Sequence, residues 1–331
     1  MQSLYITSSG KLERKQNTVS FVTKNGKRKY LPIENLKEIY IFGEVDVNKR
    51  FLDFISQKNI CIHFFNYYGY YSGTFYPREK YNSGFVFVKQ VEKYLNDKER
   101  LKIAKKFVIG ASQNSIETLK RYAKSESEIL NTIEEIRGFI KTIVGEVKNI
   151  SQLMSLEGQI KKTYYSVFNL ILKSDFFYFK KREKRPPKTP LNALISFANS
   201  LVYTVALGQI YNTHLDPRIG YLHTSNNRSF SLNLDVAEIF KPALADRVLF
   251  NLINRNQLKE KHFIKQTNGV FLSEKGRKIF LQEFDKKLNS TIYNKSLKRK
   301  VTLKNTIKIE VYKLEKHIID DLEYEPIILK N

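Results

Sequence analysis

The chain has 331 residues, of which 42% are hydrophobic and 27% are charged, and its formal net charge is +24. This length allows two or three domains, and the hydrophobic content supplies a packed core, which argues against global disorder. So strong a positive charge favours nucleic acid or an anionic membrane as a partner, although a generally basic proteome would also produce it. The single cysteine, Cys61, excludes an intramolecular disulfide framework and a cysteine-based zinc site.

The first residues, MQSLYITSSGK, do not resemble a signal peptide, and no run of about 18 apolar residues occurs along the chain. We therefore expect a soluble cytoplasmic protein that does not bind a membrane. The sequence contains no glycine-rich phosphate loop of the Walker or Rossmann kind and no internal repeat. Nucleotide-driven motor classes and repeat architectures are thus not favoured.

Short strands are predicted over residues 1–85, because β-branched and aromatic residues recur there in short runs. Asn25-Gly26 is typical of a hairpin turn between two of these runs. The clearest runs are residues 4–6, 19–22, 30–33 and 39–42. His63 lies inside a further apolar run and is expected to be a core histidine.

Aromatic residues are concentrated in the last of these strands, at residues 60–76. Tyr67, Tyr68, Tyr70 and Tyr71 have faces on which unpaired bases can stack. Such residues more often belong to a core or a subunit interface, so both interpretations stay open.

From about residue 87 the hydrophobic period becomes helical. Helices are expected near residues 88–95, 101–111, 129–144, 151–173 and 191–212. The last of them contains no charged residue, so we expect it to be buried. Thr189 is its predicted N-cap, and Pro190 occupies the first helical position.

A basic loop is predicted at residues 174–190, where Pro186-Pro187 prevent a helix. It contains two acidic residues, Asp175 and Glu183, and six basic ones: Lys180, Lys181, Arg182, Lys184, Arg185 and Lys188. This loop is either a solvated linker or a segment that contacts DNA phosphates. Its position directly after the helix that carries Glu157 favours DNA contact.

The densest group of reactive side chains lies in residues 216–247. His223 falls in a turn-like segment, and residues 231–240 have the apolar spacing of a helix. On that helix Asp235 and Glu238 are three residues apart and point to the same side. Two like charges so close repel each other unless a cation or a proton lies between them.

A further carboxylate, Glu157, falls within the apolar stripe of the predicted 151–173 helix. A carboxylate in an apolar face is costly unless it is paired or binds a metal. Glu157, His223 and Glu238, with Asp235 beside them, form an oxygen-rich ligand set that suits Mg²⁺ or Mn²⁺ better than structural Zn²⁺. From these residues alone we predict a metal-dependent nucleic-acid enzyme.

Arg247 lies beyond Glu238 on the same segment and allows two interpretations. It could orient a carboxylate or hold a DNA phosphate. It could equally form a structural salt bridge, in which case the acidic cluster would be a buried ion-pair network rather than a metal site.

Four segments, taken together, resemble the CRISPR-associated integrase family, the catalytic subunit of spacer acquisition. They are LEGQIKKTYY at 156–165, RPPKTPLNALISFANSLVY at 185–203, LDPRIGYLH with SFSLNLDVAEIFKPALADRV within 215–248, and FNYYGYYSGTFYPRE at 65–79. The last of these resembles the type I branch. Each segment alone is weak, but their order and spacing are specific.

The resemblance implies an α+β fold, with a small β-rich N-terminal domain at 1–86 that dimerises and a larger all-α catalytic domain at 87–331. It places the metal ligands on Glu157, His223 and Glu238, where many members carry Asp at the last position. Asp235 matches an additional acidic position, and Lys162 stands where a basic residue is common. A shift in metal preference could follow from Glu238, whose side chain is one methylene longer than Asp.

The activity implied by the resemblance is that of a metal-dependent DNA endonuclease and integrase. It would insert short DNA fragments into the CRISPR repeat by transesterification, with a 3′-hydroxyl as nucleophile. The implied partners are double-stranded DNA, a second copy of the chain and a second, smaller CRISPR-associated subunit. Two alternatives to this activity stay open. One is a standalone metal-dependent nuclease that acts on branched or repair intermediates, and the other is a non-catalytic DNA-binding scaffold.

Overall fold

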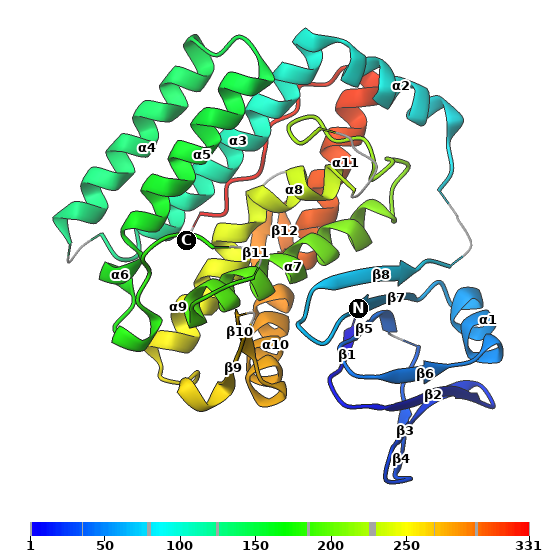
Figure 1. Cartoon of the computed structure of the whole chain (residues 1–331). Helices are drawn as coiled ribbons and strands as arrows, with labels where there is room; N and C mark the ends of the chain where they lie inside the picture. The colour runs from blue at the N-terminus through cyan, green and yellow to red at the C-terminus, as the bar shows by residue number, and fades with distance from the viewer. Residues whose placement is uncertain are drawn as a thin grey trace.

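The computed structural model describes most of the chain, with short gaps between the described segments. These segments are residues 2–34, 36–77, 81–123, 126–183, 186–224, 230–267, 269–294 and 297–330. Strands dominate up to Phe75 and helices dominate from Gly84 onwards, which confirms the predicted α+β class (Figure 1).

The N-terminal region contains two four-stranded sheets and one helix, α1 (Lys49–Gln57). The first sheet has the order β1-β5-β7-β8, with β8 as its antiparallel edge strand. Its strands are β1 (Gln2–Ile6), β5 (Leu36–Ile41), β7 (Cys61–Phe65) and β8 (Tyr71–Phe75). The second sheet has the order β4-β3-β2-β6, with strands β4 (Arg28–Leu31), β3 (Thr18–Thr23), β2 (Gly10–Lys15) and β6 (Val45–Val47).

The predicted hairpin around Asn25-Gly26 joins β3 to β4, and Gly26 adopts the positive φ of 77° that such a turn requires. Alternation along β5 directs successive side chains to opposite faces of the first sheet. Ile39 and Ile41 pack into a core shared with the second sheet. Tyr40 and Phe42 pack into the core of the helical region. The first sheet is therefore buried on both faces. The predicted boundary between two domains at residue 86 stays a prediction.

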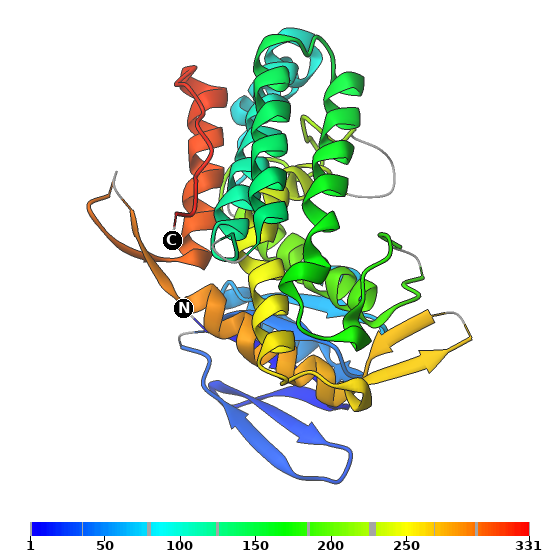
Figure 2. The same ribbon diagram turned by 90° about the vertical axis from the view of Figure 1, so that its left-hand side faces the viewer.

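Four helices follow the strands: α2 (Gly84–Leu95), α3 (Asp97–Leu119), α4 (Ser127–Gly145) and α5 (Ile150–Ser166). The predicted 151–173 helix is interrupted at Val167, where the short α6 (Phe168–Ile171) begins. Helices α3, α4 and α5 lie side by side in both views of the molecule (Figures 1 and 2). Glu157 is thus carried on α5, beside α3.

Helix α7 (Pro190–Ile210) runs through the centre of the molecule, and Thr189 caps it as predicted by accepting a hydrogen bond from the Asn192 N–H. Within the described residues it is the one helix long and apolar enough to cross a membrane, and 89% of its most apolar window is buried in the protein. Such burial is typical of a core helix. It packs against α8 (Leu232–Lys241), the helix predicted at residues 231–240.

Pro242 ends α8, and a π-helical turn (Pro242–Asp246) leads into α9 (Arg247–Asn254). A proline cannot donate a backbone hydrogen bond, so the regular α-helical ladder is interrupted here. The remaining elements are β9 (Phe263–Gln266), β10 (Gly269–Leu272), α10 (Glu274–Asn289), β11 (Thr291–Asn294), β12 (Arg299–Thr302) and α11 (Leu303–Asp320). Strands β9 and β10 pair with each other in antiparallel orientation. A C-terminal tail, residues 321–330, then runs back along α3 (Figure 1).

Candidate functional site

Asp235 occupies the first turn of α8 and is fully buried. Its carboxylate accepts backbone hydrogen bonds from Tyr221 (2.6 Å), Leu222 (3.0 Å) and His223 (3.0 Å). Gly220 allows this approach, since a Cβ there would lie 2.8 Å from an Asp235 oxygen. One buried carboxylate therefore fixes the backbone of the loop residues 221–223.

His223 lies on this loop with its Nδ1 atom 2.7 Å from Asp235 Oδ1. A carboxylate accepts hydrogen bonds, so Nδ1 carries a proton and Nε2 is the nitrogen left for a ligand. Burial acts to lower the pKa of His223, but the hydrogen bond and charge of Asp235, with the charge of Glu238, raise it above 6.5. His223 is thus within electrostatic reach of Glu238.

Glu238 lies one turn further along α8 and is 5% exposed. It pairs with Lys241 on the same helix and with Lys161 of α5, whose Nζ is 3.1 Å from Glu238 Oε2. Burial acts to raise the pKa of the Glu238 carboxyl, but these two lysines hold it well below its ordinary value. Glu238 is therefore a buried carboxylate that stays ionised.

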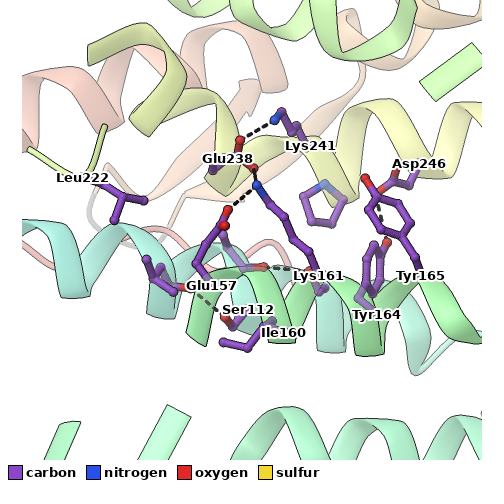
Figure 3. A pocket seen from close by; sticks show the side chains of 14 residues that line it. Ser112, Glu157, Ile160, Lys161, Tyr164, Tyr165, Leu222, Glu238, Lys241 and Asp246 are labelled. Atoms are coloured by element: carbon purple, nitrogen blue, oxygen red, sulfur yellow. Dashed lines mark hydrogen bonds and ion pairs between the residues drawn. The ribbon is translucent and has the colours of Figure 1, made fainter. Parts of the chain in front are cut away.

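Glu157 reaches the same place from α5, and its side chain is 14% exposed. Its carboxylate also pairs with Lys161, one turn later on the same helix. The Lys161 ammonium thus lies between two carboxylates that come from different helices (Figure 3). A lysine ammonium therefore lies between Glu157 and Glu238.

Glu157, Lys161, Glu238 and Lys241 line a pocket, partly open to solvent, between α3, α5, α8 and the π-helical turn. Asp246 lines its far side, where Tyr164 donates a 3.0 Å hydrogen bond to it. Burial raises the pKa of Asp246 to about 7. The pocket joins the side chains of Glu157 and Glu238 at one end to a carboxyl group that titrates near neutrality, Asp246, at the other (Figure 3).

Comparison with known proteins identifies this architecture. The family model for CRISPR associated protein Cas1 matches residues 4–286. The chain belongs to the Cas1 family. A CRISPR-associated endonuclease Cas1 of Thermodesulfovibrio yellowstonii is 51% identical over 330 residues, covering 99% of this chain and 98% of that protein. The CRISPR-associated endonuclease Cas1 of Thermotoga maritima is 48% identical and covers 97% and 98%.

Solved structures agree with this assignment. A Cas1 protein from Thermotoga maritima superposes with a TM-score of 0.88 at 46% identity and covers 99% of this chain and 100% of that one. A casposase bound to an integration product superposes with a TM-score of 0.86, covering 98% and 93%, but its 18% identity shows the common fold alone. The resemblance seen in the sequence is thereby confirmed, and the family is one of endonucleases.

The Cas1 fold brings together only part of the predicted ligand set. Glu157 and Glu238 share one cation, whereas His223 is bonded to Asp235 and is related to Glu238 through the effect of the Glu238 charge on the imidazole. Across the described segments, no group of three or more His, Cys, Asp or Glu side chains is placed to hold an ion. The expectation that Asp235 and Glu238 face a common cation is not met, because Asp235 is turned to the loop backbone.

Two functional residues were missed at the sequence level, Lys161 and Lys241. Each stands one helical turn after an acidic residue, Lys161 after Glu157 and Lys241 after Glu238. That spacing was a usable signal, because residues three and four apart on a helix are neighbours. This spacing did not single out the two lysines, because acidic and basic residues at the same spacing are common on solvated helix faces.

The predicted DNA-contacting residues fall into three groups. Lys162, Lys180, Lys181 and Lys188 are exposed, whereas Lys184 and Arg185 lie outside the described residues. Arg182 is half-buried and donates 3.0 Å hydrogen bonds to Asn192 Oδ1 and Ser196 Oγ of α7. Its guanidinium therefore anchors the basic loop to α7.

Arg247, which was also predicted to contact DNA, is buried in the structure. Only 6% of it is exposed, and its guanidinium donates to Thr118 Oγ1 (3.2 Å) and to the Glu117 carbonyl (3.4 Å) of α3. Burial lowers its pKa to about 10. These hydrogen bonds hold the buried guanidinium on α3, and neither of them is the salt bridge that the sequence offered as the structural alternative. The cations that pair with the acidic cluster are Lys161 and Lys241 instead.

Proposed function

We propose that this chain is a metal-dependent DNA endonuclease and integrase that inserts short DNA fragments into a CRISPR repeat. The observation that carries the proposal is the pair Glu157 and Glu238, two carboxylates from different helices around one cation. They stand beside a histidine held in one tautomer by Asp235, in a chain of the Cas1 family. A buried ion-pair network alone would need no oriented imidazole next to it.

The donor chemistry of this group fits a hard divalent cation. Two acidic side chains and one imidazole suit Mg²⁺ or Mn²⁺, and Asp235 supplies the supporting hydrogen bond that metal-bound histidines have. Glu157, His223 and Glu238 would hold the ion. When bound, the ion supplies charge that polarises a phosphoryl oxygen and offsets the negative charge of the transition state.

The proposed reaction is the attack of a DNA 3′-hydroxyl on a phosphodiester of the repeat. One phosphodiester bond forms and another breaks, the displaced strand leaves with a 3′-hydroxyl, and no nucleoside triphosphate is consumed. Water in place of the hydroxyl gives hydrolysis at the same site. Lys180, Lys181 and Lys188 on the basic loop would hold the duplex through its phosphates without reading sequence.

The proposed partners are double-stranded DNA, a second copy of the chain bound through its β-rich region, and a smaller adaptation subunit, all in the cytoplasm. Related solved structures support the first and the last of these partners, because one is a Cas1–DNA complex and another is a Cas6-RT-Cas1–Cas2 complex. The net charge of +24 is consistent with the DNA partner.

A joining assay tests the proposal. A short duplex with free 3′-hydroxyls is incubated with a supercoiled plasmid that carries a repeat, in Mg²⁺ or Mn²⁺, with wild type and His223→Ala. We expect a covalent fragment–plasmid product from wild type and none from His223→Ala, which should still bind DNA. His214→Ala is the matched control, because His214 pairs with Glu315 away from the candidate site.

Each other outcome has a defined meaning. If wild type nicks the plasmid but joins nothing, even with the smaller subunit added, the standalone nuclease replaces the integrase. If wild type and His223→Ala give the same product, the assignment of His223 is wrong. If neither nicking nor joining occurs while DNA is bound, the scaffold is the correct interpretation.

A further inference from the structure

Lys161 occupies an unusual position for a lysine. It lies on α5 one turn after Glu157, and its ammonium pairs with Glu157 and, at 3.1 Å, with Glu238 Oε2 of α8. The lysine therefore links the two helices at the point where the two candidate ligands meet (Figure 3). A divalent ion bound by both carboxylates would need this same place.

The two lysines of the pocket differ in how firmly they are held. Lys241 is 10% exposed as a side chain, pairs with Glu238 and also contacts the hydroxyl and the ring face of Tyr203. Lys161 is 37% exposed as a side chain, so its long aliphatic stem has a route to solvent. Lys161 is therefore the cation that can leave without disturbing the core.

Charge balance explains why a lysine is needed there. Within the described residues, Glu157 has no ion pair other than that with Lys161. Without Lys161, the two carboxylates would face each other, and Lys241 would remain paired with Glu238 alone. An uncompensated buried charge is costly. Either a metal ion or the Lys161 ammonium can balance the charge of Glu157 and Glu238. The two cations cannot occupy the same space at once.

We propose that Lys161 is a built-in counter-ion that stands in the place of the divalent cation and is displaced when the cation binds. This inference rests on the proposed function, because it takes Glu157 and Glu238 as ligands. The displaced ammonium stays tethered at the open side of the pocket, where a DNA phosphate is its natural new partner. Metal and DNA are therefore expected to strengthen each other's binding, since linkage is reciprocal.

The test measures Mn²⁺ binding to the full-length protein by electron paramagnetic resonance, without DNA and independently of activity. Lys161→Met keeps the stem and removes the charge, so it removes the competitor. We expect it to bind Mn²⁺ at least about tenfold more tightly than wild type. Lys141→Met, on the exposed face of α4, is the control for the loss of one positive charge and should match wild type.

The variant Glu157→Gln distinguishes a failure of this inference from a failure of the proposed function. If Glu157→Gln binds Mn²⁺ much more weakly than wild type but Lys161→Met binds no more tightly, the ion binds at the site and the counter-ion role is overturned. If Glu157→Gln binds as wild type does, the site itself is not the metal site, and the proposed function fails together with this inference.

A second measurement needs no variant, in case Lys161→Met does not fold. Wild-type lysines are acetylated briefly with and without Mg²⁺ and quantified by mass spectrometry. We expect acetylation of Lys161 to rise when Mg²⁺ is present, because its ammonium has left the carboxylates, while Lys141 is unaffected. Unchanged or stronger protection of Lys161 in Mg²⁺ would overturn the inference.

Discussion

Both carboxylate oxygens of Asp235 accept hydrogen bonds from residues 221–223, the segment that contains His223. Three backbone N–H groups and the imidazole Nδ1 donate to it from distances of 2.6 to 3.0 Å. The sequence placed Asp235 beside the predicted ligands, and in the structure its carboxylate contacts one of them, His223. The sequence could not predict the loop hydrogen bonds, because the turn geometry of residues 220–223 has no strong local signal.

Asp235→Asn tests this positioning role. The amide keeps the size of the side chain but places two N–H groups where only acceptors fit, so at least one backbone donor or the imidazole loses its partner. We expect activity in the joining assay to fall by about 10- to 100-fold. DNA affinity measured by fluorescence anisotropy should stay the same.

Asp320→Asn is the matched control for this substitution, since Asp320 is exposed at the end of α11. It should leave the joining rate unchanged. A joining rate of Asp235→Asn equal to that of wild type would contradict the positioning role.

At the scale of elements, the C-terminal tail ties α3 to the helix of the site. Asn114 of α3 accepts a hydrogen bond from the Leu329 N–H (2.7 Å) and donates to the carbonyls of Ile327 (3.0 Å) and Ile239 of α8 (2.9 Å). The tail crosses α3 at Gly110, where a Cβ would lie 2.6 Å from Pro326. Asn114 of α3 therefore links the tail to α8, the helix that carries Glu238.

A pair of glycine substitutions tests the contribution of this crossing. Gly110→Ala adds a methyl group where Pro326 leaves no room, so the tail must shift, and we expect a loss of about 1–3 kcal/mol in the free energy of unfolding. Gly138→Ala on α4 meets nothing within 4 Å. It should instead stabilise the protein by about 1 kcal/mol, because alanine favours a helix more than glycine does.

Urea denaturation followed by circular dichroism measures both effects. Limited proteolysis of Gly110→Ala should in addition release the tail earlier than in wild type. If both variants are stabilised to the same extent, the tail does not pack on α3 as described.

At the scale of the whole molecule, a buried polar cluster joins the first sheet to the helical region. Glu38 of β5 accepts hydrogen bonds from Lys304 of α11 (2.6 Å), Tyr40 (2.8 Å) and Gln209 of α7 (3.2 Å). Burial acts to raise the pKa of Glu38, but Lys304 and His63 lower it below its ordinary value. Three segments far apart in sequence thus meet around one ionised carboxylate.

Lys304→Met is expected to be strongly destabilising, because it leaves Glu38 charged and buried without its cation. The expected loss is about 3–5 kcal/mol of unfolding free energy, measured by urea denaturation. Lys316→Met, exposed on the same helix, should have little effect. Adding Glu38→Gln to Lys304→Met should recover part of the loss; no recovery would mean that Lys304 acts through packing rather than charge.

The sequence by itself determined the succession of strands and helices, the cap at Thr189, the hairpin at Gly26 and the identity of the acidic residues and the histidine near the site. These features depend on residues within a few positions of each other, so their patterns are visible along the chain. Tertiary structure alone decided which cation faces which carboxylate, since Lys161 meets Glu238 only because α5 packs near α8. It likewise turned Arg247 inward to α3 and brought Lys304 to Glu38, because such pairings depend on how distant helices and strands cross.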